Sequence, residues 1–133
     1  MIVIDTSAVV AVLRDEPERR AFTEVIEQAE RCLISAVSFV EASMVIEARN
    51  GYDGLRDFDL FMLKAGIEVA AVDAEQAKIA RSGFRKFGKG RHAANLNFGD
   101  CFSYALAKAV EAPLLFKGND FSRTDVEAAV KGR

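Results

Sequence analysis

The sequence has few of the residues that enzymes use as nucleophiles or as soft metal ligands. Among 133 residues there are two cysteines and one histidine. Cys32 and Cys101 belong to no CxxC or Cys/His pair, so we interpret both as reduced core residues. His92 stands alone in a loop and is not expected to act as a general base. A zinc site or a histidine-based triad is therefore not indicated.

Proline and long apolar runs are also scarce. The chain has 2 prolines and no low-complexity tract, which predicts order over nearly its whole length. Its apolar runs are too short to span a bilayer, and the N-terminus MIVID lacks the basic region and long apolar segment of a secretion signal. We expect a cytoplasmic protein without a membrane partner. The net charge of -2 gives no overall bias toward nucleic acid, so an anionic partner would need a local basic patch.

The length fits one domain over residues 1–133, and strand patterns alternate with helix patterns along it. Such alternation predicts an α/β fold in three layers, with a mostly parallel sheet of four to five short strands and helices on both faces. The strands are expected at 2–4, 33–34, 67–72 and 114–116. The helices are expected at about 6–14, 17–29, 35–49, 52–65, 73–87 and 97–112. Residues 122–130 fit either an edge strand or a helix.

The helix boundaries rest on local signals. Thr6 or Ser7 is expected to cap the first helix, and Gly51 to end the helix that begins near Ser35 or Ser38. Asn97 is a good N-cap for the last helix, which Pro113 ends.

Three aspartates fall where a strand ends or a helix begins. Asp5 follows the first strand, Asp100 lies in the first turn of the last helix, and Asp120 follows the strand 114–116. In parallel sheets, ligands bind beyond the carboxyl ends of the strands, so these side chains are expected to converge. Glu41 adds a fourth acid. Helical spacing places it on an apolar stripe with Val37, Met44, Val45 and Ala48, where a carboxylate would be costly to bury unpaired.

A basic loop precedes the last helix. The segment 81–97 contains six basic or histidine side chains and no acid, and its glycines suggest flexibility. Helix-dipole complementarity accounts for Arg85 and Lys86 but not for Lys89 and Arg91. We predict contacts to a phosphate backbone from Lys86, Lys89, Arg91 and, near the last acid, Lys117.

Clustered carboxylates without histidine or cysteine suit a hard cation such as Mg²⁺ or Mn²⁺ better than zinc. Beside a basic patch, such an ion would polarise a phosphoryl oxygen and lower the pKa of a bound water. This chemistry hydrolyses phosphodiesters and needs no protein nucleophile.

In these residues the chain resembles the PIN-domain ribonucleases, and among them the VapC-type toxins of bacterial toxin–antitoxin pairs. The resemblance covers the whole chain. It is carried by MIVIDTSAVVAVL, LISAVSFVEASMVIEAR, FGKGRHAANLNFGDCFSYALAK and PLLFKGNDFSRTD, in this order.

The resemblance implies a PIN-like fold and a magnesium-dependent endoribonuclease. Asp5, Glu41, Asp100 and Asp120 match the acidic metal-binding and catalytic positions, and Asn119 is the alternative to Asp120 as the fourth ligand. Ser7 matches a small polar position beside the first acid, and we group Thr6 and Asn119 with it as supporting residues. An antitoxin that blocks the site and a homodimer are also implied.

The main alternative is a non-catalytic magnesium-binding regulatory domain similar to a receiver domain. Such a domain has paired acids after its first strand, whereas Asp5 is followed by Thr6 and Ser7. A phosphatase similar to the haloacid dehalogenases would need an acid at position 7.

Overall fold

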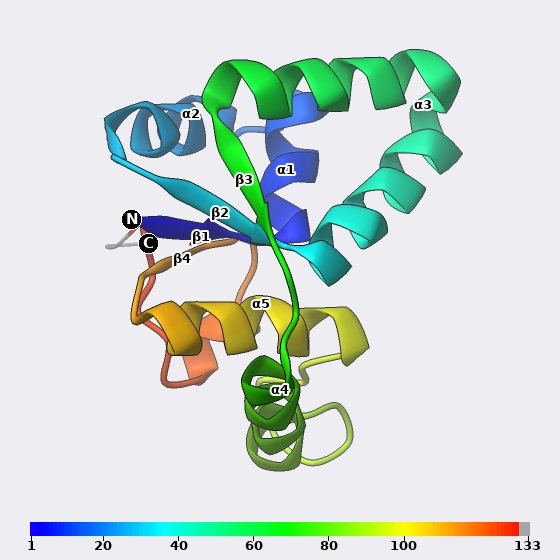
Figure 1. Cartoon of the computed structure of the whole chain (residues 1–133). Helices are drawn as coiled ribbons and strands as arrows, with labels where there is room; N and C mark the ends of the chain where they lie inside the picture. The colour runs from blue at the N-terminus through cyan, green and yellow to red at the C-terminus, as the bar shows by residue number, and fades with distance from the viewer. Residues whose placement is uncertain (131–133) are drawn as a thin grey trace.

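The computed structural model describes residues 1–130, and in it strands and helices alternate along the chain (Figure 1). The strands are β1 (Ile2–Ile4), β2 (Cys32–Ser35), β3 (Ile67–Ala70) and β4 (Leu114–Leu115). The helices are α1 (Thr6–Leu13), α2 (Arg19–Gln28), α3 (Ala36–Ala65), α4 (Ala74–Phe87) and α5 (Phe98–Val110), with a 3-10 turn η1 (Phe121–Arg123). The strands form one parallel sheet in the order β3-β2-β1-β4. The predicted α/β class and parallel sheet are confirmed.

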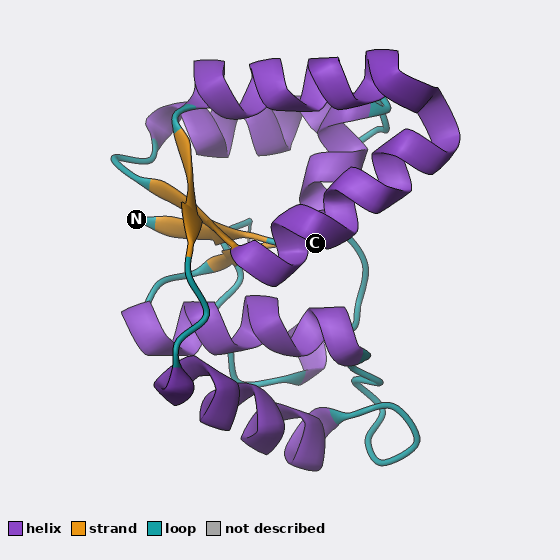
Figure 2. Cartoon of the chain, turned by 45° about the vertical axis from the view of Figure 1, so that its right-hand side comes forward, coloured by secondary structure: helices purple, strands orange, loops and turns teal. Residues whose placement is uncertain are grey.

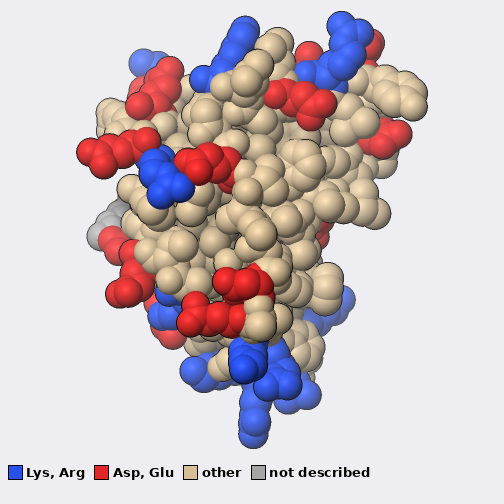
Figure 3. All heavy atoms as spheres, in the orientation of Figure 1, with Lys and Arg blue, Asp and Glu red and all other residues tan. Residues whose placement is uncertain are grey.

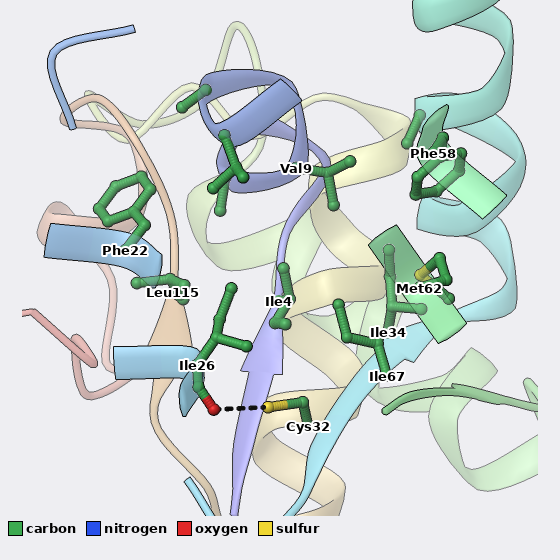
Figure 4. Close-up of a cluster of buried hydrophobic side chains, with 14 of the residues drawn as sticks. Ile4, Val9, Phe22, Ile26, Cys32, Ile34, Phe58, Met62, Ile67 and Leu115 are labelled. Atoms are coloured by element: carbon green, nitrogen blue, oxygen red, sulfur yellow. Dashed lines mark hydrogen bonds between the residues drawn. The ribbon is translucent and has the colours of Figure 1, made fainter. Parts of the chain in front are cut away.

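The sheet lies between two helical layers. Helices α1, α2 and α3 cover one face, and α4 and α5 cover the other (Figures 1 and 2). Successive strand side chains point to opposite faces, so Ile4 and Ile34 enter the first core while Val3 and Leu33 enter the second. Figure 4 shows the first core, where Phe58 of α3 is fully buried near these isoleucines. Burial on both faces explains why the strands read as continuous apolar runs.

Helix α3 bends sharply at one glycine. Gly51 has φ 63° and ψ -156°, a conformation that glycine adopts at low cost. Two helices separated near this residue were predicted, and the structure instead joins them without a loop as two arms of one element (Figure 2). The predicted break is therefore at the right residue.

Two local predictions are wrong. The N-cap of α1 is Asp5, whose carboxylate accepts the backbone N–H of Ser7, rather than Thr6 or Ser7. The inward positions of the first arm of α3 are Ser38, Ala42 and Ile46. Met44 is 66% exposed and Val37 and Val45 are only half-buried, so the stripe assigned to Glu41 is not the face of α3 that packs into the core.

The tail after η1 is extended. Leu114 of β4 donates its N–H to the carbonyl of Glu127, and the N–H of Ala129 returns a bond to Leu114. The resulting parallel bridge between Leu114 and Ala128 is isolated, so up to residue 130 the tail contacts the edge of the sheet at one point and forms neither a helix nor a full strand. None of the described helices has the length and apolar character that crossing a membrane requires.

Candidate active site

Asp5 occupies the carboxyl end of the central strand β1 and is 3% exposed. Its Oδ2 accepts the backbone N–H and the hydroxyl of Ser7, at 3.0 and 2.7 Å. Its Oδ1 accepts the hydroxyl of Ser103 at 2.6 Å, and Ser103 Oγ lies 2.8 Å from Ser38 Oγ. Neutral donors from α1 and α5 therefore fix the orientation of this buried carboxylate, and Ser38 of α3 supports it through Ser103.

Glu41 reaches the same edge of the sheet from the second turn of α3, after β2. Its Oε1 accepts the hydroxyl of Thr6 at 2.7 Å, and that hydroxyl also lies 3.2 Å from the carbonyl of Ser38. The carboxylate rests against the first turn of α5, where a Cβ on Gly99 would lie 2.7 Å from the Glu41 Cδ. A side chain at this position would displace the Glu41 carboxylate from its place against α5.

Asp100 lies beside Gly99 and completes a capping box with Asn97. Each side chain of the pair accepts the other residue's backbone N–H, at 2.9 and 3.0 Å. Burial raises the pKa of Asp100 from 3.8 to about 7; the hydrogen bond from Asn97 opposes the rise, and the charges of Asp5, Glu41 and Asp120 add to it. The four predicted acids are thus close enough to repel one another.

Asp120 and Asn119 follow β4 in a turn that begins at Gly118, whose φ is 100°. Both side chains are exposed. The carbonyl of Asn119 accepts the hydroxyl of Ser122 at 2.6 Å, which helps hold the turn before η1. The role of Asn119 or Asp120 as the fourth ligand stays a prediction.

Lys117 was predicted to bind RNA, and in the structure it contacts residues of this chain. Its backbone N–H donates to Ser7 Oγ at 3.0 Å, which links the end of β4 to the hydroxyl that orients Asp5. Its ammonium lies 2.8 Å from Glu16 and 3.3 Å from Glu18. These two carboxylates compete with any phosphate for the lysine.

The other basic candidates lie at the far end of the α4/α5 layer. Lys86, Lys89 and Arg91 are exposed, and Figure 3 shows Lys and Arg side chains gathered at the α4 end of the molecule. The N–H of Lys89 donates to the carbonyl of Leu96, and the N–H of Leu96 donates to the carbonyl of Phe87, which closes the loop at its base. His92 accepts the N–H of Ala94 within this loop, as a local structural contact.

The acid cluster has no compensating base among residues 1–130: none of its four acids forms an ion pair with lysine or arginine. Within those described residues, no group of three acidic, histidine or cysteine side chains is already close enough to hold a metal ion. The donors are nevertheless all carboxylate oxygens, the type that hard divalent cations prefer. The residues fit such a cation in chemistry and in net charge.

Sequence reasoning missed three residues of the site. Ser38 and Ser103 are fully buried, and each lies three positions from an acid on its own helix, Glu41 and Asp100 respectively. Spacing of three places two side chains on neighbouring parts of one helix surface. A serine three positions from an acid was the available signal for these two; the third residue, Gly99, was not among the predicted site residues.

The chain matches the PIN domain family over residues 2–127. Over 125 residues it is 51% identical to VapC ribonuclease Mb0640 of Mycobacterium bovis, covering 94% of this chain and 95% of that protein. It is 50% identical over 127 residues to the ribonuclease VapC of Mycolicibacterium smegmatis, covering 96% and 98%.

Solved structures agree in fold. The crystal structure of Mycobacterium tuberculosis VapC20, described as a sarcin–ricin loop cleaving toxin, superposes with a TM-score of 0.79 at 16% identity, covering 99% of this chain and 100% of that one. FitAcB from Neisseria gonorrhoeae gives 0.68 at 20% identity, covering 96% of each chain. From the family match and the relatives of about 50% identity, the chain belongs to the PIN domain family and, within it, to the VapC ribonucleases.

Proposed function

We propose that this ribonuclease is the toxin of a toxin–antitoxin pair and cuts RNA at the acid cluster formed by Asp5, Glu41, Asp100 and Asp120. The observation that carries the proposal is geometric: Glu41 contacts Gly99 beside Asp100 and is bonded to Thr6 beside Asp5, with no lysine or arginine paired to these acids among residues 1–130. In agreement with it, burial and the charges of the other three acids raise the pKa of Asp100 to about 7. Four neighbouring carboxylates without a lysine or arginine repel one another, and a bound cation would offset this repulsion. We take residues 1–133 to be one PIN-like domain.

The cation is proposed to be Mg²⁺, with Mn²⁺ as a substitute, bound through Asp5, Glu41 and Asp100 and through Asp120 or Asn119. When bound, such an ion lowers the pKa of a coordinated water and polarises a phosphoryl oxygen. The chain supplies the geometry. Three hydroxyl or amide donors hold Asp5, Thr6 orients Glu41, and Asn97 orients Asp100.

RNA would approach from the basic side of the molecule. Lys89 and Arg91 project from the loop that leads into α5, whose first turn carries Asp100. Lys86 extends the same surface, whereas Lys117 would have to leave Glu16 and Glu18 to take part. Backbone contacts of this kind give affinity without sequence preference, so the cut site must be read elsewhere.

An antitoxin and a second copy of the chain are the proposed protein partners, in the cytoplasm. The structure of VapBC2 from Rickettsia felis, bound to promoter DNA, is a toxin–antitoxin assembly with a related fold. Helix α3 exposes Met44, Tyr52, Leu60 and Leu63, a wide apolar surface that a partner would cover. A monomer at tens of micromolar in light scattering would contradict the dimer.

The decisive experiment measures RNA cleavage with Mg²⁺ or Mn²⁺, with EDTA, and with two matched variants. Glu41→Gln removes a cluster charge, while Glu47→Gln removes an exposed charge from the same arm of α3. We expect EDTA and Glu41→Gln to abolish cleavage and Glu47→Gln to leave it intact. Equal rates for both variants under saturating metal would show that the site is misassigned. Metal binding without any RNA cleavage would favour the receiver-like alternative.

A further inference from the structure

An apolar pocket lies between α4 and α5. Phe84, Phe98 and Phe102 line it together with two alanines, Cys101 and the stem of Arg81, and its volume is about 400 Å³. We call it the aromatic pocket. Phe98 is 74% exposed, and its ring lies 5.0 Å from that of Phe102, centroid to centroid, at 59°. An aromatic ring so exposed presents a free face to a ligand.

A cationic hollow adjoins the aromatic pocket. Arg81, Arg85, Arg91 and Phe84 line this second hollow, of about 390 Å³, so Arg81 and Phe84 border both spaces. The guanidinium of Arg91 lies 5.6 Å from the centre of the Phe84 ring. Arginine is suited to phosphate, and stacking on a ring holds its planar group in place. The apolar pocket suits the base of a nucleotide, and the adjoining hollow with three arginines suits its phosphate.

The position of the aromatic pocket relative to the acids is set by α5. Phe98 is the first residue of that helix, Gly99 contacts Glu41, and Asp100 carries the carboxyl with the raised pKa. Phe98 is therefore within one helical turn of the residues proposed to cut the strand. Because two positions turn a helix by about 200°, Phe98 and Asp100 leave α5 on different sides. A strand cut at the acids would therefore have to pass around the first turn of α5 to place a base at Phe98.

We propose that the aromatic pocket is a subsite for one unpaired RNA base, which stacks on Phe98 while its phosphate is held by Arg81, Arg85 and Arg91. This inference rests on the proposed RNA cleavage, and it adds a contact to the base where the basic loop contacts only the phosphate backbone. An apolar segment of a protein would fill the pocket but would leave three arginines without anionic partners. Single-stranded nucleic acids are commonly bound by this combination of stacking surface and basic groove.

The first test measures binding of a short single-stranded RNA of mixed sequence, labelled with fluorescein, in EDTA so that it is not cut. Phe98→Ala is compared with Tyr52→Ala, which removes an aromatic ring of 80% exposure from α3. We expect Phe98→Ala to raise the Kd about 5- to 150-fold, the loss of one stacked base. Tyr52→Ala should bind like the parent. Because both rings are exposed, neither variant should lose its fold.

Salt dependence and an abasic strand separate stacking from phosphate contact. Phe98→Ala should leave the slope of log K against log salt unchanged, while Lys89→Ala should reduce it by about 0.7. Phe98→Ala should bind an abasic version of the strand as the parent does. An equal loss of affinity for the abasic strand would overturn the base subsite.

The sequence contains no tryptophan, so a single indole can report the contact directly. Fluorescence of F98W should be quenched by the RNA and not by the abasic strand, whereas that of Y52W should respond to neither. Unquenched F98W, or parent-like RNA affinity of Phe98→Ala, would overturn the subsite. The subsite would also be overturned if Phe98→Ala bound RNA like the parent but no longer formed the dimer or bound the antitoxin. The pocket would then be a protein interface. A parent that neither binds nor cuts RNA refutes the proposed function itself, which is a separate result.

Discussion

Replacing Asp100 by asparagine should stabilise the metal-free protein at neutral pH. The pKa of this carboxyl rises from 3.8 to about 7, first because it is buried and then because Asp5, Glu41 and Asp120 repel its charge. Asparagine removes the charge and keeps an oxygen that can accept the N–H of Asn97. The variant therefore keeps the capping contact and loses the repulsion.

The sign follows from proton linkage. Between pH 4 and 7 the folded parent binds more protons at position 100 than the unfolded chain does, so its stability falls as pH rises through this window. A rise of about three pKa units corresponds to about 4 kcal/mol as an upper limit. Partial solvent contact and screening reduce this to about 1–2 kcal/mol, which still exceeds the 0.3–1 kcal/mol lost at the helix dipole.

The assay is a melting series in EDTA at low salt from pH 4.5 to 8. For a chain of this size, 1 kcal/mol corresponds to about 3–5 °C, so Asp100→Asn should melt a few degrees higher than the parent at pH 8 and nearly level with it at pH 4.5. The matched control is Glu75→Gln in the first turn of α4, an exposed acid that serves only a helix dipole. It should melt slightly lower than the parent.

Added magnesium should reverse the ranking. The melting temperature of the parent should rise with the logarithm of free Mg²⁺ above its Kd, because the ion binds only the folded form. Asp100→Asn should respond less and should not cleave RNA. An Asp100→Asn protein that melts below the parent in EDTA and responds equally to magnesium would refute the reasoning.

Two further variants test how the acids are held. Gly99→Ala should change the free energy of unfolding by less than about 1 kcal/mol, because a flexible carboxylate can move aside, yet it should slow RNA cleavage by displacing Glu41; unchanged cleavage would show that this contact is incidental. Ser103→Ala should lower the urea-unfolding free energy by about 1.5–3 kcal/mol at a constant m-value, since Asp5 loses a charge-assisted hydrogen bond within a buried network. Parent-like stability of Ser103→Ala would mean that another donor replaces the hydroxyl.

Much of the fold could be predicted because its signals are local. Apolar runs bounded by polar residues located the strands, and the capping residue Asn97 and the helix break at Gly51 were readable from their types. Parallel pairing followed from strand–helix alternation. The tail was ambiguous because its single bridge at Leu114 depends on a distant strand rather than on its own periodicity.

The acids could be predicted, whereas their partners could not. Asp5 and Asp100 stand at ends of elements, which a sequence reveals. The bond from Ser103 to Asp5 joins residues 98 positions apart, and no local pattern reports it. The inward face of α3 around Glu41 was wrongly predicted, because apolar residues occur on two faces of this helix and only packing against other elements selects between them.

The contacts around the acids also explain how the metal-free chain can hold them together. Repulsion at Asp100 opposes folding at neutral pH, and among the described residues no lysine or arginine is paired with the four acids. Hydroxyl donors of Thr6, Ser7 and Ser103 take that place. Neutral donors stabilise a carboxylate without cancelling its charge, so the cluster stays attractive to a cation, whereas an arginine would have occupied the site. The short polar residues after β1 are therefore as much a part of the site as the acids that they hold.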